Sequence, residues 1–303
     1  MTEDPRHISV LLEETMDVLR PGPGDNILDC TVGLGGHAAA FLERTAPDGA
    51  FTGIDADGEN LERARIRLAP SGGRVALRHG NFRDLSAFEP GSFDIVFADL
   101  GLSSPHVDDA GRGFSFRSEA LLDLRYDRSS GYPAASFLAW CREEDVEEAL
   151  RLYGEIRGSR RLAAAIKRAA PATTSALRKT VESALGFRAR KILPQVFQAL
   201  RIAVNDEMNA LNGLLNGAIA LLRPGGRMGI IAYHSLEDRM VKQFFRDITT
   251  PPKDPVTGAD SAPAAFELCT KKAVMPTDRE VAANPRSRSA RLRAIRKVVR
   301  PRS

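Results

Sequence analysis

Residues 26–36, Asn-Ile-Leu-Asp-Cys-Thr-Val-Gly-Leu-Gly-Gly, join a short apolar run to a glycine cluster, the pattern of a β-strand that enters a tight turn. Three more strand-like runs follow at residues 50–54, 74–77 and 93–98, and residues with helical spacing separate the first three runs. Strands that alternate with helices predict a parallel sheet with helices on both faces. We therefore expect an α/β, doubly wound, Rossmann-like fold.

The next strand-like run, residues 227–232, comes roughly 125 residues later, whereas a simple crossover needs about 30. The intervening residues show three helical patterns, with breaks at Pro171 and Gly186. We therefore expect a helical insertion domain at 111–195 after the fourth strand, within a cofactor-binding domain formed by 1–110 and 196–303.

The second half of the expected cofactor domain contains three further elements. Apolar residues from Phe197 to Leu222 recur at steps of three, four or seven, which predicts one long helix. A helix near 236–245 and a last strand at 291–298 complete the prediction.

Charge is unevenly distributed along the 303-residue chain, whose formal net charge is +4. Residues 157–191 hold ten Arg or Lys and one acid, and residues 286–302 hold eight basic residues and no acid. Such segments indicate either a polyanionic partner or a solvated helix face with a basic tail. No apolar run could span a membrane, no signal peptide is visible, and three cysteines form neither a disulfide framework nor a zinc pattern. We expect a cytoplasmic protein that binds no membrane and no metal.

The glycine cluster has an acid at the spacing of a nucleotide site. Asp55, nineteen residues after Gly36, ends the second predicted strand, where a carboxylate can accept hydrogen bonds from both ribose hydroxyls. Two cofactors fit: a dinucleotide, because Gly33, Gly35 and Ala38 satisfy G-x-G-x-x-G/A, or S-adenosylmethionine. A glycine-rich turn beside an exposed Asp is the plain structural alternative.

Position along the sheet favours a ligand site. In doubly wound sheets ligands bind beyond the carboxyl ends of the strands. Polar, aromatic or glycine residues stand at five such ends, namely 33–36, Asp55, Asn81-Phe82, Asp99 and Tyr233-His234. The turn Leu222-Arg223-Pro224-Gly225-Gly226 resembles the one before the fifth strand of many class I methyltransferases, which favours S-adenosylmethionine.

Six segments, in order along nearly the whole chain, carry a more specific resemblance. They are His7-x-x-Val10-Leu11-Leu12-x-Glu14; Asp29-x-Thr31-x-Gly33-x-Gly35-Gly36-His37; Asp99-Leu100-Gly101-x-Ser103-Ser104 with Asp108-Asp109 and Arg112-Gly113-Phe114-Ser115-Phe116; Phe197-Gln198-Ala199-Leu200-Arg201-Ile202-x-Val204-Asn205-x-Glu207; His234-Ser235-Leu236-Glu237-Asp238-Arg239-x-Val241-Lys242; and Arg286-Ser287-Arg288-Ser289-Ala290-Arg291-Leu292-Arg293.

These segments resemble the 16S ribosomal RNA (cytosine-N4)-methyltransferase family. The resemblance implies S-adenosylmethionine as methyl donor and, as substrate, a cytidine in the decoding region of 16S ribosomal RNA within the small subunit. It leaves a homodimer open. The cofactor positions that it implies are Gly35, Gly36, His37, Asp55, Phe82, Asp99 and His106.

The chain departs from the family pattern at three places. His106 stands where the family usually has a glutamine that touches the cofactor, and an imidazole cannot bond as a carboxamide does. Residues 119–125 and 193–196 also differ, but both stretches lie in or beside the predicted insertion. We expect cofactor binding to survive these two changes.

Asp99 is the catalytic candidate. The exocyclic N4 of cytosine is a weak nucleophile, and a carboxylate that accepts its N–H could orient the amino group and stabilise its developing positive charge. A contact to the cofactor alone is the other interpretation of Asp99. Methylation at C5 would instead need a cysteine nucleophile, and none lies beside the fourth-strand motif.

The fifth strand leads to a second candidate. Ser235 and Asp238 fit a capping box, with Ser235 capping the following helix, while His234 could face the target base. Two other classes of protein also remain open: an NAD-dependent oxidoreductase, and a noncatalytic RNA-binding protein on a methyltransferase scaffold.

Overall fold

The computed structural model describes residues 9–254 and 257–299, and the chain divides into two compact units. The first unit joins the residues up to Gly101 to those from Ala210 onward, and the second unit is Leu102–Asn209. The second unit is wider at both ends than the stretch 111–195 expected from the sequence. Each unit is described separately below.

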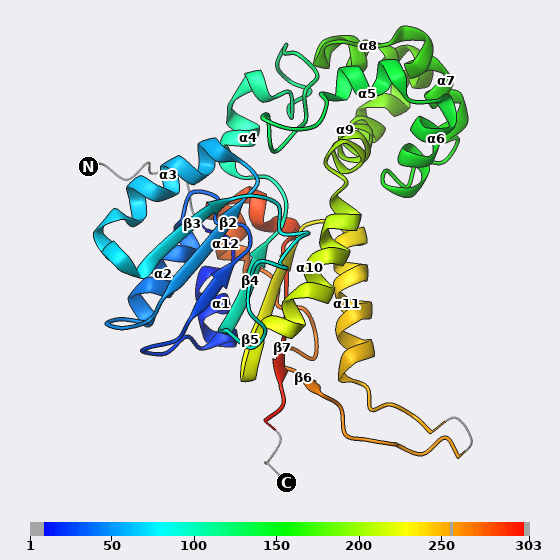
Figure 1. The fold of residues 1–303 in the computed structure, drawn as a ribbon. Coiled ribbons are helices and arrows are strands. Elements are labelled where there is room, and N and C mark those ends of the chain that lie inside the picture. The colour runs from blue at the N-terminus through cyan, green and yellow to red at the C-terminus, as the bar shows by residue number, and fades with distance from the viewer. Residues whose placement is uncertain (1–8, 255–256, 300–303) are drawn as a thin grey trace. The chain divides into compact units, whose positions relative to one another are not determined.

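The first unit is built on a seven-stranded sheet of order β3-β2-β1-β4-β5-β7-β6 (Figure 1). Strands β1 to β5 are parallel, and β7 runs antiparallel to both β5 and β6. The strands are β1 Ile27–Asp29, β2 Phe51–Asp55, β3 Val75–His79, β4 Phe93–Asp99, β5 Leu222–Ala232, β6 Phe266–Leu268 and β7 Arg291–Lys297. The predicted doubly wound α/β sheet is therefore confirmed, as is the last strand.

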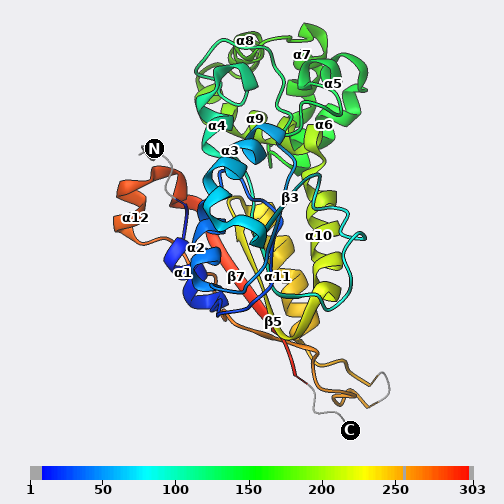
Figure 2. The ribbon, with the colours of Figure 1, turned by 60° about the vertical axis from the view of Figure 1, so that its left-hand side comes forward.

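Helices cover both faces of this sheet (Figure 1 and Figure 2). Alternation along β4 explains why both faces are apolar: Val96 and Ala98 belong to the core under α10 and α11, whereas Ile95 and Phe97 belong to the core under α1, α2 and α3. The helices of this unit are α1 Leu12–Leu19, α2 Gly36–Arg44, α3 Gly58–Leu68, α10 Glu207–Leu221, α11 Ser235–Thr249 and α12 Asp278–Ala283, with the 3-10 helices η1 Ala69–Arg74 and η4 Pro285–Ser289.

The second unit is helical and has a hydrophobic core of its own. Helices lie where the three apolar patterns placed them, and the breaks fall at Ala170 and Gly186, both with positive φ. Its elements are α4 Ser104–Asp108, η2 Ala110–Arg112, α5 Ala134–Trp140, α6 Glu143–Leu152, α7 Ser159–Ala169, α8 Thr174–Leu185, η3 Gly186–Arg188 and α9 Ala189–Asn205.

The prediction of a single long helix after the insertion is wrong, because two helices, α9 and α10, occupy this stretch. Asp206 adopts the left-handed conformation, with φ of 52°, and separates α9 from α10. Asp is one of the few residues whose short polar side chain makes this conformation accessible. Arg201 and Glu207 form an ion pair across the break, with Nε 2.8 Å from Oε1. The apolar spacing continues through Asp206, so periodicity could not reveal the break.

Candidate active site

The glycine loop takes a conformation that requires glycine. Gly33 and Gly35 both have positive φ, of 53° and 78°. A side chain on Gly35 would also lie 3.4 Å from Leu68 and 3.6 Å from the backbone of Ala64, so glycine lets the loop approach α3 closely. The chain then enters α2 at Gly36, which leaves the first amides of that helix at the carboxyl edge of the sheet.

Asp55 is bonded directly to this loop. Its Oδ2 accepts the Gly33 N–H at 2.7 Å, and its Oδ1 accepts the Asp57 N–H at 2.8 Å. Burial raises the pKa of Asp55 to about 6, although these two backbone hydrogen bonds act in the opposite direction. Each carboxylate oxygen keeps a second lone pair, so the group can still accept two ribose hydroxyls. The glycine loop and the acid picked out by spacing are thus in direct contact, through Gly33 and Asp55.

Asp29, at the end of β1, is a further candidate, which the sequence analysis quoted only as part of a family segment. It is 1% exposed, and its Oδ1 accepts the Thr31 N–H at 2.9 Å. Its Oδ2 is buried without a hydrogen-bond partner. Burial raises the pKa of Asp29 to about 8, and the neighbouring charges of Asp99 and Asp55 add to this effect. A buried oxygen left unpaired in this way is suited to a ligand that brings a donor.

Asp99, at the end of β4, is held by its neighbours on three sides. Its Oδ1 accepts the hydroxyl of Tyr233 at 2.8 Å, its Oδ2 lies 3.7 Å from Nδ1 of His37, and its backbone N–H donates to the hydroxyl oxygen of Thr31 at 2.6 Å. Burial raises the pKa of Asp99 to about 7, while the Tyr233 hydrogen bond acts to lower it. A carboxyl group with this pKa can exchange a proton near neutral pH.

His37 is oriented from both ring nitrogens. Its Nε2 lies 3.1 Å from the carbonyl oxygen of Val10, and because a carbonyl only accepts, this nitrogen carries the proton in the neutral ring. Nδ1 then faces Asp99, and the ring packs on Phe97 with centroids 4.8 Å apart. His37 and Asp99, both predicted cofactor residues, are therefore neighbours.

Two other predicted cofactor residues have different surroundings. Phe82, in the loop after β3, is half-buried against the hydrophobic core under α10 and α11. His106 belongs to the second unit and is 4% exposed, with its ring 5.2 Å from Phe114 and 5.3 Å from Tyr126. Its Nδ1 accepts the Ser103 N–H at 3.1 Å, which caps α4. Cofactor contacts of both residues stay predictions.

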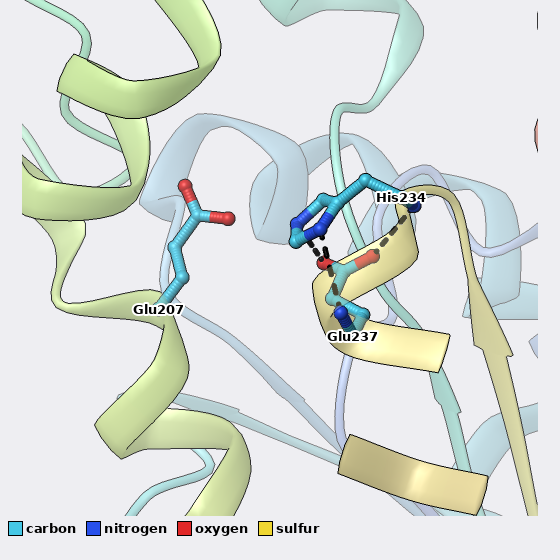
Figure 3. A group of neighbouring side chains, drawn as sticks. All are labelled: Glu207, His234 and Glu237. Atoms are coloured by element: carbon cyan, nitrogen blue, oxygen red, sulfur yellow. Dashed lines mark hydrogen bonds and ion pairs between the residues drawn. The ribbon is translucent and has the colours of Figure 1, made fainter. Parts of the chain in front are cut away.

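The helix cap after β5 differs by one residue from the sequence prediction. His234, not Ser235, is the N-cap of α11: its Nδ1 accepts the Glu237 N–H, and the Glu237 carboxylate accepts the N–H of His234 at 3.3 Å (Figure 3). The same carboxylate accepts the N–H of Tyr233 at 2.9 Å. An imidazole nitrogen can cap as a hydroxyl does, and the usual preference for Ser concealed this. The His234 side chain therefore caps the helix, and its contact with the target base stays a prediction.

Asp238, the second member of the box that the sequence suggested, has another role. It accepts hydrogen bonds from Arg291 and Arg293 of β7 at 2.9 and 2.7 Å. Burial raises its pKa, but the two arginines outweigh burial and the net shift is downward. Arg296 also pairs with Glu267 at 2.7 Å, so at least three of the eight basic residues of the second basic segment are paired within the fold.

The strand order, the antiparallel β7 and the glycine loop with its acid define a class I methyltransferase fold. The model of the MraW methylase family matches residues 4–298. The chain is 46% identical to "Ribosomal RNA small subunit methyltransferase H" of Syntrophotalea carbinolica, with 97% of this chain and 98% of the relative covered. It is 44% identical to the protein of the same name from Symbiobacterium thermophilum, with 96% of each covered.

The chain belongs to the MraW methylase family. It is an S-adenosylmethionine-dependent methyltransferase, and neither the oxidoreductase nor the noncatalytic alternative holds. Within the described residues, no helix is long and apolar enough to cross a membrane.

Proposed function

We propose that the chain transfers the methyl group of S-adenosylmethionine to the N4 amino group of a cytidine in the decoding region of 16S ribosomal RNA, within the small subunit. The single observation that carries this proposal is its 46% identity, over 97% of its length, to a relative named ribosomal RNA small subunit methyltransferase H. We expect the enzyme in the cytoplasm, where ribosomes are assembled.

The cofactor fits the residues at the carboxyl edge of the sheet. We infer that Asp55 accepts the ribose hydroxyls while holding the loop at Gly33, and that Gly35, Gly36 and His37 line the same site. To these predicted residues we add Asp29, whose unpaired buried Oδ2 suits a positively charged donor such as the amino group of the methionine part. Phe82 and His106 remain part of the proposal on the family pattern alone.

Asp99 is the proposed catalytic residue. The bound cofactor supplies a methyl group on a positively charged sulfur, which becomes a neutral thioether as the N4–carbon bond forms. In ionised form Asp99 accepts one N4–H hydrogen bond, which directs the nitrogen lone pair and stabilises the positive charge that N4 acquires. Tyr233 holds Oδ1, whereas Oδ2 lies 3.7 Å from Nδ1 of His37 and is the oxygen proposed to accept from the substrate. N4 afterwards releases one proton, to Asp99 or to water.

Cysteine chemistry is not needed for this reaction. Methylation at C5 of cytosine uses a thiolate nucleophile, and Cys30 is the cysteine next to the glycine loop. It is buried, and burial raises the pKa of its thiol well above the ordinary value. A thiol in this state is inert, which supports N4 as the target.

The second unit is the proposed RNA-recognition domain. It has an independent core, and ten of its residues between 157 and 191 are basic against a single acid. Lys and Arg at such density suit phosphate contacts, which position RNA without reading its sequence.

Mass spectrometry of nucleosides tests the proposal. Small ribosomal subunits from cells that lack the enzyme are incubated with the purified protein and S-adenosylmethionine, and their 16S RNA is digested. N4-methylated cytidine should appear with the wild-type protein and be absent with Asp99→Ala. Methyl groups found on C5, on the ribose or on another base would contradict the assigned reaction.

A further inference from the structure

A groove in the second unit lies between the end of α8 and the start of α9 and contains a fully exposed aromatic ring. Gly186, with φ of 57°, ends α8, and the short helix η3 presents Phe187, which is 94% exposed. Ala189 and Leu193 beside it are buried, so the local core is closed without this ring. The groove is lined chiefly by Phe116, Arg117, Arg178, Phe187, Arg190 and Leu193.

The rim of the groove is positively charged. Three arginines line it, and Glu182 is its one acidic lining residue in the part of the chain that is described. Arg178 is fixed in place: its Nη1 donates to the Phe116 carbonyl at 3.3 Å, and its Nε lies 3.9 Å from Glu182. Arg117 and Arg190 are exposed, and Lys179, Arg188 and Lys191 nearby along the chain add further exposed charge.

An exposed aromatic ring among cations is the combination that binds unpaired nucleotides. Every base has a face that stacks on an aromatic side chain, and the arginines attract the phosphates on either side of that base. Duplex RNA offers phosphates but no free base face. A second copy of this chain would bring a rim of the same positive sign, so charge disfavours it as the occupant.

We propose that this groove binds one unstacked nucleotide of single-stranded RNA, with its base against Phe187 and its neighbouring phosphates against Arg117, Arg178 and Arg190. The proposal rests on the proposed function, because it takes RNA as the substrate class. It adds a site for a base on the second unit and assigns no chemistry to it.

A tryptophan placed at the groove tests stacking directly. Trp140 is the only tryptophan, so the variant Trp140→Phe/Phe187→Trp carries a single indole, at position 187. Titration with oligocytidine RNA of about 12 nucleotides should quench its fluorescence, because that length covers one binding site and a stacked base quenches indole emission. A blunt RNA duplex of the same length should quench it far less. If oligocytidine saturates the protein without quenching, no base stacks there and the proposal fails.

Affinity and its salt dependence separate the ring from the charges. Phe187→Ala should weaken oligocytidine binding by about fivefold to 150-fold, the range for removing the stacking partner of one base, with the salt slope unchanged. Phe187→Tyr should restore affinity.

Arg117→Ala/Arg190→Ala should make the log–log salt slope shallower by about 0.7 for each phosphate that the variant no longer binds. Arg117→Lys/Arg190→Lys keeps both charges and should have the wild-type salt slope. Wild-type affinity in Phe187→Ala, or a slope unchanged by removal of both arginines, would overturn the assignment.

Two further measurements keep this inference distinct from the proposed function. If the wild-type protein methylates small subunits at N4 and the Phe187→Ala variant has the same rate and RNA affinity, the groove assignment is wrong and the proposed function stands. If the wild-type protein methylates no RNA but oligocytidine quenches the indole of the Trp140→Phe/Phe187→Trp variant, the proposed function is wrong and the groove assignment stands. If the wild-type protein sediments as a dimer, and Phe187→Ala dissociates that dimer without changing RNA affinity, the groove is a contact between copies and the proposal is wrong.

Discussion

Asp55 holds the glycine loop through Gly33 and is also the proposed ribose ligand, so its replacement acts on two contacts. Asp55→Ala should abolish measurable S-adenosylmethionine binding by calorimetry. The fold should persist, since the two hydrogen bonds that Asp55 accepts contribute only about 1 kcal/mol each and a buried charge is removed with them. Circular dichroism should therefore be unchanged. Near wild-type affinity in a folded variant would rule out the ribose role.

Asp99 gives the reaction its expected pH dependence. The ionised carboxylate accepts the N4–H more strongly than the neutral acid does and carries the negative charge that stabilises N4. Burial raises the pKa of Asp99 to about 7, so the single-turnover rate should rise with pH through about 7. Tyr233→Phe removes the hydrogen bond that lowers this pKa. Its rate profile should then move to higher pH, while the rate at high pH falls much less than in Asp99→Ala.

Rapid-quench measurements across the pH range check this shift. Thr31→Val is the matched control, because it removes a contact to the Asp99 backbone and leaves the Tyr233 contact to the carboxylate in place. A Tyr233→Phe profile with an unmoved midpoint would mean that another group controls the rate.

The sequence predicts these residues unevenly, for a physical reason. Asp55 and Asp99 could be found because their place at strand ends follows from alternating strands and helices. Asp29 stands at such an end too, but its significance is an unpaired buried oxygen, and pairing is a property of three-dimensional surroundings. The sequence analysis did not predict the capping role of His234 for the same reason, since an imidazole cap depends on the orientation of the ring.

Among the elements, α7 has a basic face that is suited to phosphate contacts. Its lysine, Lys167, is instead hydrogen-bonded within the second unit. Lys167 Nζ donates to the carbonyls of Leu138 and Cys141, both at 2.6 Å, and so closes the end of α5. The residues to replace are therefore Arg160, Arg161 and Arg168, which are all exposed.

The triple variant Arg160→Ala/Arg161→Ala/Arg168→Ala should keep S-adenosylmethionine affinity nearly unchanged. Its RNA affinity should fall, with a salt slope shallower by about 0.7 for each phosphate of single-stranded RNA that is no longer neutralised, and by up to about 0.9 for each phosphate of a duplex. Fluorescence anisotropy over a series of salt concentrations measures both quantities. As a control, Lys167→Ala should chiefly lower the melting temperature. A wild-type slope in the triple variant would make this part of α7 a solvated face.

Element prediction succeeded where a local pattern fixed the structure. The helices α6, α7 and α8 have apolar residues at helical spacing, and each such face is buried in the second unit's core. The break at Asp206 and the short strand β6 were missed. A single left-handed residue leaves apolar spacing intact, and Phe266–Leu268 is a strand only because β7 lies beside it.

At the scale of the whole molecule, three acids crowd the carboxyl edge of the sheet. Burial raises the pKa values of Asp29, Asp55 and Asp99 to about 8, 6 and 7 from an ordinary value of 3.8. A folded-state pKa above the unfolded one means that the folded protein holds protons more tightly, so its stability falls as pH rises through the folded-state values. The unligated protein should thus lose stability between about pH 4 and pH 8.

Thermal melts of the unligated protein over this pH range test the expectation. Asp29→Asn removes one of the three ionisations and should raise the melting temperature more at the alkaline end than at the acid end. Saturating S-adenosylmethionine should flatten the dependence, because a cationic group beside the acids offsets their repulsion. A melting temperature that rises steadily with pH would contradict the proton-binding account.

The position of β7 has a consequence for how the protein is made. This strand lies inside the sheet, between β5 and β6, yet it is the last element among the described residues. Leu102–Asn209 has its own core and emerges from the ribosome complete while the sheet around β4 still lacks β5 and β7. We expect the inserted unit to fold first on the nascent chain, as domains generally fold in units during synthesis. The methyl-transferring domain, although it begins at the N-terminal end, is then the last part to close, after translation has passed Lys297.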